Sequence, residues 1–397
     1  MKTRKVFGAD PHVLFDEKTN SYYCYATSGH SNGKSFHVYK SKDLVEWEDL
    51  GLALDTETNR WGKDWYWAPE CYFNPNNGKY YLFYSARVND ELTAEYFEDP
   101  EYFESAKIGV AVSDTPEGPF VNITNRPIDY YPFDKEYLDV EKIYDNIFEA
   151  NIDPLEVEKA PRGQYVSMID VNLFFEDEKI YMYYSRCCYK NVRYDRKLNK
   201  FIEESNIVAV ELNTDWWYDK EAKTMPTIKD RFINQNNESS KHRRDGFVNI
   251  INYASQPQDW ENGHVSDYEK SNGTKRNRRW SEGSTTFKVQ YKNEEYYALT
   301  YSCNNYENEL YGVGISFSKD PLSLFNKYEN NPIIKQSPCD SLYSTGHGCL
   351  VTFNNETYYF FHGRETKEED RILYVGRLHM DDLENVYVDN IKQCSLK

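Results

Sequence analysis

Apolar and polar positions alternate in short runs along most of the chain, and one unit of this pattern recurs five times. Its centre is an aromatic-rich run, at residues 21–28, 79–86, 179–186, 295–302 and 357–364. A second apolar run precedes each of them across a turn rich in Asn, Gly, Asp and Glu, and a third follows. Runs of this length and spacing predict three consecutive antiparallel strands per unit.

Five such units predict an all-β fold, a five-bladed β-propeller, because a closed ring of small sheets leaves few open strand edges. A β-sandwich whose strands resemble one another by accident is the alternative. Two segments, 121–166 and 218–280, are polar, poorly periodic and too long for hairpins. They are expected to be loop insertions on one face of a single domain that spans residues 1–397.

Composition narrows the class of partner. The 397 residues include 36 Tyr, 21 Phe and 8 Trp, and the formal net charge is −18. Nucleic acid is excluded as a partner because its phosphates would repel such a chain. Aromatic side chains favour strands and also supply flat surfaces for sugar rings. The oligomeric state stays open.

No membrane association is expected, because no run of 18 apolar residues occurs. The first residues lack the apolar centre of a signal peptide, so the protein is either cytoplasmic or secreted after loss of such a signal. The eight cysteines show no CxxC spacing, which argues against a zinc site and leaves disulfides open.

Polar residues stand just before the first strand of several units. Inner strands of a propeller surround its axis, so side chains at this position should converge on one end of the central funnel. Gathering carboxylates is costly through repulsion and desolvation, and proteins that do so usually use them for metal binding or acid–base chemistry. Proline after the first of them stiffens the backbone there. The five candidates are Asp10, Glu70, Asp170, Glu282 and His347.

Two carboxyl groups on opposite sides of a sugar can hydrolyse a glycosidic bond, one as the acid and the other as base or nucleophile. Each candidate also has a structural alternative: a strand cap for Asp10, a ligand of backbone amides for Asp170, a surface glutamate for Glu282.

At these positions the sequence resembles glycoside hydrolase family 43. The matching phrases are ADPHVLFD (9–16), WAPECYFNPNNGKYYLFYSA (67–86), IDVNLFFEDEKIYMYYS (169–185), SEGSTTFK (281–288), GHGCLVTF (346–353) and FHGR (361–364). The resemblance implies a five-bladed propeller, an inverting mechanism, and activities such as β-xylosidase, α-L-arabinofuranosidase and arabinanase.

The resemblance also implies residue roles. Asp10 would be the general base, Glu282 the general acid, and Asp170 the residue that raises the pKa of the acid and holds it in place. His347 would lie near the axis beside a calcium ion or a water cluster; no cofactor is required for the chemistry.

Three further residues would line the substrate site. Arg364 would reach the innermost sugar, Trp67 would form a wall, and Glu70 would support that wall. Glu70 with Cys71 also resembles the acid motif of invertase-like families, but it precedes Asp170 instead of following it.

Two departures from the family pattern stand out. Val171 replaces the proline that often follows the middle aspartate, and Gly283-Ser284 replaces the Gly-Pro that often follows the acid.

The sequence therefore predicts an inverting glycosidase that removes terminal α-L-arabinofuranosyl or β-D-xylosyl units from plant cell-wall pentosans, with an oligo- or polysaccharide as substrate. An endo-acting arabinanase, a catalytically silent sugar-binding propeller and a protein-interaction scaffold are the alternatives.

Overall fold

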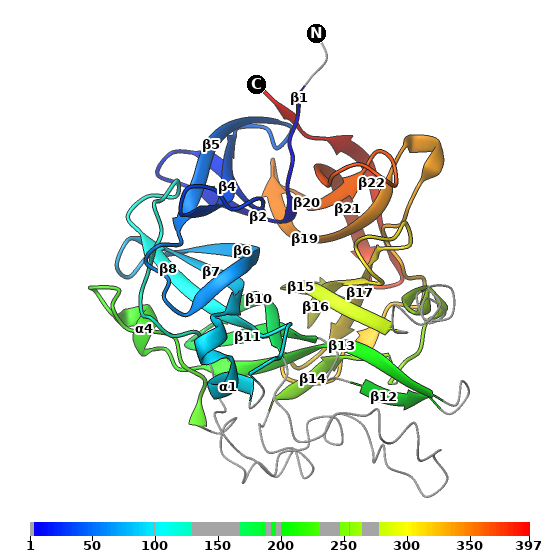
Figure 1. Cartoon of the computed structure of the whole chain (residues 1–397). Helices are drawn as coiled ribbons and strands as arrows, with labels where there is room; N and C mark the ends of the chain where they lie inside the picture. Colours follow the sequence, from blue (N-terminus) through cyan, green and yellow to red (C-terminus); the bar gives the residue numbers. More distant parts are fainter. Residues whose placement is uncertain are drawn as a thin grey trace, which may run out of the picture.

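The computed structural model describes residues 4–97, 100–128, 167–187, 192–195, 200–230, 247–253, 255–263 and 278–397. Its sheets form a ring around a central axis, and the innermost strands of neighbouring sheets face one another across that axis (Figure 1). This is the five-bladed propeller that the repeats predict. Most of the two predicted insertions, including 129–166, 231–246 and 264–277, lies outside the described residues.

Each blade is an antiparallel sheet whose strands follow one another from the axis outward. The inner three strands of the blades are, in order, β2 (Ala9–Asp16), β3 (Ser21–Thr27), β4 (Lys34–Ser41); β6 (Gly62–Asn74), β7 (Lys79–Val88), β8 (Ala106–Ser113); β10 (Ser167–Glu176), β11 (Lys179–Cys187), β13 (Lys200–Leu212); β15 (Arg278–Tyr291), β16 (Glu294–Cys303), β17 (Gly312–Ser318); β19 (Tyr343–Phe353), β20 (Glu356–Arg364), β21 (Ile372–Asp382).

A fourth, outer strand completes every blade, and the repeats do not predict it because it is variable in length and sequence. These strands are β5 (Glu46–Asp55), β9 (Val121–Asn122), β14 (Val248–Ile251), β18 (Asn326–Lys327) and β22 (Asn385–Gln393). Segment 218–280, expected to be loop throughout, therefore contains the outer strand of the third blade, and the expectation was wrong there.

A few elements lie outside this plan. Strand β12 (Val192–Asp195) pairs with β13, and β13 also pairs in parallel with β15, which joins the third and fourth blades into one sheet. Strand β23 (Ser395–Leu396) pairs with both β1 (Arg4–Lys5) and β5, so the two ends of the chain meet on the first blade (Figure 1). The described residues also form the helices α1 (Asp90–Phe97) and α4 (Asp215–Tyr218) and the 3-10 turns η2 (Asp259–Asn262) and η3 (Pro338–Asp340).

The buried hydrophobic side chains of the described residues form five clusters, each lying between two neighbouring blades. The second strand of each blade is therefore buried on both faces. In β7, for example, Tyr80, Leu82 and Tyr84 pack towards the first blade, whereas Tyr81 and Phe83 pack towards the third. This double burial accounts for the aromatic runs in the sequence, since large flat side chains fill the space between splayed sheets.

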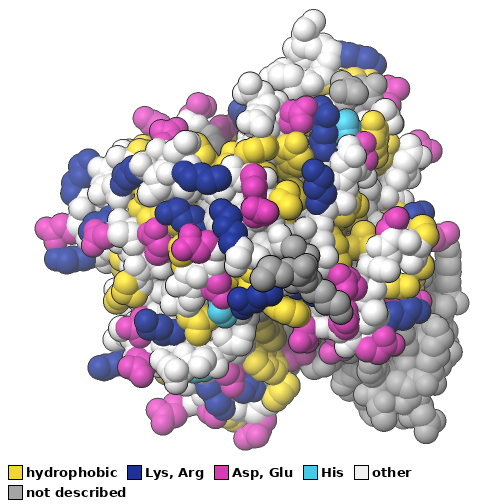
Figure 2. Space-filling model, turned by 90° about the horizontal axis from the view of Figure 1, so that it is seen from above, with side chains coloured by type: hydrophobic (Ala, Val, Ile, Leu, Met, Phe, Trp, Pro, Cys, Tyr) yellow, Lys and Arg dark blue, Asp and Glu magenta, His cyan; other side chains and the backbone are white. Residues whose placement is uncertain are grey.

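The outer wall carries charge of both signs. Acidic and basic side chains are interspersed on the side of the ring near the chain ends (Figure 2), although the chain as a whole is strongly acidic. Within the described residues, no helix is both long and apolar enough to cross a membrane.

Candidate active site

All five inner strands carry a β-bulge near the same end of the ring. At each bulge the strand register shifts by one extra residue, and one residue adopts a left-handed backbone conformation. Non-glycine residues rarely adopt this conformation, and where they do the position is often functional. The five residues, with their φ angles, are Asp10 (49°), Ala68 (48°), Asp170 (55°), Gly283 (61°) and His347 (37°).

Contacts from the preceding blade fix these bulges. The backbone N–H of Ala68 donates to Thr27 Oγ1 at 2.8 Å, that of Asp170 to Ser85 Oγ at 3.0 Å, and that of His347 to Ser302 Oγ at 2.7 Å. The N–H of Asp10 donates to His362 Nδ1 at 3.0 Å. Each acceptor lies at the same place in its strand, opposite the residue that precedes its own blade's bulge.

The fourth blade departs from this pattern, because its bulge bonds a carboxyl group. The N–H of Gly283 bonds the carboxyl group of Asp170, and Ser185 donates to Asp170 Oδ2 at 3.3 Å. Glu282 stands one residue before its bulge, so its side chain comes from a different position than those of Asp10 and Asp170. The backbone of the predicted acid is thereby attached to the middle aspartate.

These bulges surround a cavity of about 430 Å³ at the axis. Five of the seven predicted site residues line it: Asp10, Trp67, Asp170, Glu282 and His347. Residues from other parts of the chain that sequence reasoning did not single out also line it: Trp65, Glu104, Ala106, Ile169, Trp280, Asn305, Tyr306, Glu307 and Arg371.

Asp10 lies among cationic and polar groups. His347 Nδ1 lies 3.3 Å and Arg371 Nη1 3.4 Å from Asp10 Oδ1, and His362 Nδ1 also lies 3.4 Å from it. Burial opposes ionisation of Asp10, yet these neighbours lower its pKa to about 2. Burial lowers the pKa of both histidines, so Arg371 is the neighbour that stays charged at neutral pH. Asp10 is therefore an ionised carboxylate.

Glu282 has the opposite environment. Its side chain is buried, with 9% of the residue exposed. Burial raises its pKa to about 7, although hydrogen bonds from Tyr311 (O–H to Oε1, 2.7 Å) and Trp280 (Nε1–H to Oε2, 2.6 Å) oppose that rise. Asp10 adds to the rise through its negative charge. Glu282 is therefore protonated in mildly acidic solution.

Asp170 lines the same cavity and is also buried. Burial, followed by the negative charges of Glu282 and Asp10, raises its pKa well above the ordinary value. One site thus holds carboxyl groups whose pKa values are pushed apart, which is the arrangement that acid and base roles require.

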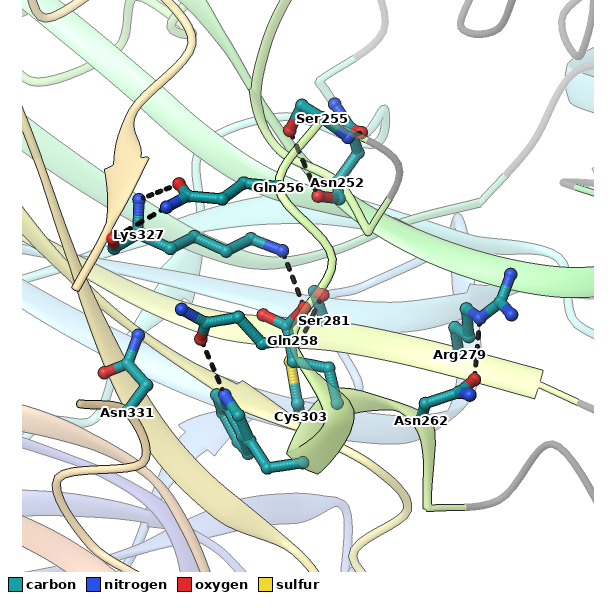
Figure 3. A network of polar contacts seen from close by, with 12 residues as sticks. Asn252, Ser255, Gln256, Gln258, Asn262, Arg279, Ser281, Cys303, Lys327 and Asn331 are labelled. Atoms are coloured by element: carbon teal, nitrogen blue, oxygen red, sulfur yellow. Dashed lines mark hydrogen bonds and ion pairs between the residues drawn. The ribbon is translucent and has the colours of Figure 1, made fainter. Parts of the chain in front are cut away.

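A polar network behind β15 fixes the residues that precede Glu282 (Figure 3). Lys327 Nζ lies 2.6 Å from Glu261 Oε2, and both side chains are almost fully buried. The other oxygen of Glu261 accepts the Tyr301 hydroxyl at 2.8 Å. Gln256 exchanges hydrogen bonds with the backbone of Lys327, which fastens segment 255–263 to the fourth blade.

Three further contacts hold β15 directly before Glu282. The backbone of Asn304 donates to the carbonyl of Trp280, and Ser205 Oγ donates to that of Ser281. Arg279 donates to Asn262 Oδ1 at 2.8 Å (Figure 3). Since these contacts hold the residues directly before Glu282, the carboxyl group is presented from a rigid strand.

Glu70 and Arg364 do not line the cavity. Glu70 instead belongs to a ring of side-chain hydrogen bonds between blades, in which it accepts from Asn172 Nδ2 at 3.2 Å and from the Tyr72 hydroxyl. His12, Asn172, Thr285 and Cys349 occupy the matching positions and bond the next blade in turn. Arg364 Nη1 donates to the carbonyl of Glu369 at 2.7 Å.

A calcium ion beside His347 is not supported by the donors present. Calcium takes six to eight oxygen ligands, whereas Nδ1 of His347 faces the Asp10 carboxylate. In the described part of the chain, no three His, Cys, Asp or Glu side chains gather as a metal-binding group. The chemistry below uses no metal.

Comparison with known proteins agrees with this geometry. The model of the glycosyl hydrolases family 43 matches residues 3–150. A solved structure of a thermostable family-43 glycoside hydrolase is 26% identical, with a TM-score of 0.64, and the match covers 99% of this chain and 96% of that one. The first part of the chain thus matches glycoside hydrolase family 43, and the whole chain is similar to a solved member of that family.

Two curated proteins match over part of their length. A xylosidase/arabinosidase of Bacteroides ovatus is 31% identical over 129 residues, which are 30% of this chain and 35% of that protein. A probable arabinan endo-1,5-alpha-L-arabinosidase C of Aspergillus terreus is 32% identical over 111 residues, 27% of this chain and 29% of that protein. The matches thus span about a third of these relatives.

Proposed function

We propose that this protein is an inverting glycosidase of family 43 that removes terminal α-L-arabinofuranosyl or β-D-xylosyl units from pentosans. The observation that carries the proposal is the opposite shift of two carboxyl groups in one cavity, the pKa of Asp10 being lowered and that of Glu282 raised.

The chemistry follows from these protonation states. Ionised Asp10 takes a proton from a water molecule while the water oxygen bonds the anomeric carbon. Protonated Glu282 gives its proton to the glycosidic oxygen as the bond between that oxygen and the anomeric carbon breaks. The sugar leaves with inverted configuration, and Asp10 and Glu282 return to their starting states by proton exchange with solvent.

The other residues orient and tune this pair. Asp170 bonds the N–H of Gly283 and so holds the backbone directly after Glu282 in place. Arg371 keeps Asp10 ionised. Trp67 and Trp280 supply apolar walls for the sugar, and the Trp280 indole also holds Glu282 in place.

Removal of single terminal units fits a cavity of this volume, which lies in the range of small-ligand pockets. The second candidate is endo-action on arabinan, since one matching relative is named as an arabinan endo-hydrolase. It would require substrate to extend beyond the cavity on both sides of the cleaved bond.

A panel of aryl pentosides and of arabino- and xylo-oligosaccharides tests the proposal. We expect release of single pentose units, and NMR spectra recorded at once should show the anomer opposite to that of the substrate. Release of the same anomer would indicate a retaining enzyme, and oligosaccharide products from linear arabinan would favour the endo-acting candidate.

A further inference from the structure

Two aromatic rings extend the cavity wall outward from Trp67. Trp65 stacks on Trp67, with ring centroids 4.9 Å apart and an angle of 17° between the planes. Phe103 then packs edge-on against Trp65, with centroids again 4.9 Å apart and an angle of 82°. The cavity wall therefore continues towards solvent as a connected row of three rings.

Arg87 fixes the outer part of this row. Its guanidinium lies 4.5 Å from the centroid of Trp65 and 5.0 Å from that of Phe103. Asp64 accepts two hydrogen bonds from it, at 2.6 Å from Nε and 2.5 Å from Nη2. Trp65 itself has a φ of 54°, an unfavourable conformation for a bulky residue that is usually kept where function needs it.

The turn before β8 presents Phe103 to solvent. Tyr102 points inward and packs on Phe97, with 7% of its surface exposed, and Glu104 lines the cavity. Phe103, between them, is 63% exposed. The Phe103 ring contacts one aromatic ring and one guanidinium, and most of its surface is in water. Packing in the core therefore does not account for a phenylalanine at this position.

We propose that Phe103 and the adjoining edge of Trp65 bind the sugar on the leaving-group side of the cleaved bond, and that this sugar is a β-linked xylopyranosyl unit. The proposal rests on the proposed function, which places the departing unit of the substrate at the mouth of the cavity. Phe103 lies beside Glu104, so the next sugar out from the cavity reaches its ring.

The chemistry of the ring selects a pyranose. A β-xylopyranosyl unit carries its substituents in equatorial positions, so both of its faces present C–H groups. Such a face complements the negative face of an aromatic ring. A row of rings along one wall fits a chain of flat sugars better than it fits puckered furanose units.

Two substrates separate this subsite from the catalytic residues. Xylo-oligosaccharides place a sugar on Phe103, whereas glycosyl fluorides have a leaving group of one atom and cannot reach it. We expect Phe103→Ala to lower kcat/KM for oligosaccharides about tenfold, mainly through KM, and to leave fluoride hydrolysis within about twofold of wild type. Equal losses on both substrates, or on neither, would overturn the subsite.

Two variants serve as controls. Phe103→Tyr keeps the ring and should keep oligosaccharide activity. Phe15→Ala removes another exposed phenylalanine, 42% exposed, at the far end of β2 from Asp10, and should change neither substrate. Thermal unfolding of all variants shows whether each is folded.

Binding without turnover separates failure of the subsite from failure of the proposed function. Calorimetry of xylotriose with the Asp10→Asn variant should give a Kd that Phe103→Ala raises about tenfold. If the wild-type protein hydrolyses nothing yet this difference appears, the proposed function fails and the subsite stands. If Phe103→Ala leaves the Kd unchanged, the subsite fails.

Discussion

His362 accepts the backbone N–H of Asp10 at 3.0 Å, across the boundary between the last blade and the first. In three other blades, the side chains of Thr27, Ser85 and Ser302 accept the equivalent backbone N–H from the next blade. The same hydrogen bond therefore links the last blade to the first and orients the backbone of the predicted base. Tyr311, stacked on His362 at 5.7 Å, in turn donates to Glu282, so the surroundings of the base and of the acid are in contact.

Asp10→Asn tests the base. The amide cannot take a proton from water, so we expect kcat/KM to fall about a thousandfold or more. Asparagine has nearly the same shape, and its backbone N–H can still donate to His362. The melting temperature should therefore stay close to that of the wild type, and a normal rate in a folded variant would exclude Asp10 as the base.

Glu282→Gln tests the acid through its dependence on the leaving group. An amide cannot protonate the glycosidic oxygen, so substrates with poor leaving groups should lose about a hundredfold or more in rate. Aryl glycosides with activated leaving groups need little assistance and should lose far less. The ratio of the two losses is the measurement, and similar losses on both would contradict the assignment.

The same carboxyl group should set the alkaline limit of activity. Because burial raises the pKa of Glu282 to about 7, the protonated form is lost as the pH rises through that value. We expect kcat/KM to fall about tenfold for each further pH unit, and the fall should disappear from the profile of Glu282→Gln on an activated substrate.

Gly283→Ala tests the bulge that carries the acid. A Cβ atom there would lie 2.6 Å from the His347 ring, and the φ of 61° disfavours any side chain. We expect a large loss of activity and a lower melting temperature. Gly51 also has a positive φ, but an added Cβ there would meet no atom within 4 Å, and at Gly29 neither the φ nor the space opposes a side chain. Gly51→Ala and Gly29→Ala therefore separate the effect of backbone strain from that of the clash.

The repeats predict the propeller because the second strand of each blade is buried on both faces, and a strand buried in this way appears in the sequence as an aromatic-rich run. They also place Asp10, Asp170 and His347 correctly on one end of the axis, since all three stand at the bulge of an inner strand. Glu70 lies two residues after Ala68, the left-handed residue of its bulge. Its side chain therefore points towards the next blade, where it bonds Asn172. Aligning the blades on Ala68 would have shown this.

Arg371 could not be found in the same way. It precedes β21 in a polar stretch without periodicity, and its place beside Asp10 depends on how the loop from β20 folds back. Tyr311 is likewise brought to Glu282 by tertiary packing, whereas Trp280 lies two residues before Glu282 on the same strand. The four Ser, Thr and His acceptors of the bulges, by contrast, recur at one strand position and were visible in the repeats.

Glu70→Gln tests whether this residue is structural. Burial raises the pKa of Glu70 to about 8, against hydrogen bonds from Tyr72 and Asn172 that lower it. A carboxyl group whose pKa is raised by folding destabilises the protein once the unfolded chain can ionise, so its cost grows from about pH 4.5 to pH 8. At 1.36 kcal/mol per pKa unit, the full effect of this rise is about 5 kcal/mol.

The measurement for Glu70 is the difference in unfolding free energy between pH 6 and pH 9. We expect the wild-type protein to lose stability over this range and Glu70→Gln to lose markedly less. Activity at pH 6 should be nearly unchanged because Glu70 does not line the cavity. An equal pH dependence in both proteins would show that Glu70 is not the titrating group.

Comparing the pH profiles of Arg371→Met and Arg364→Met tests which of the two arginines acts on the base and at the innermost sugar. Arg371 is the neighbour of Asp10 that stays charged, so its removal should raise the pKa of Asp10. A base with a higher pKa is protonated at higher pH, and the acid limb of kcat/KM should therefore move up by one pH unit or more, as is usual for loss of a close opposite charge. Arg371→Lys keeps the charge and should move the acid limb less.

Arg364 donates to the carbonyl of Glu369, and Arg364→Met should leave the acid limb in place. A shift in that variant alone would restore the role that the family resemblance gives to Arg364.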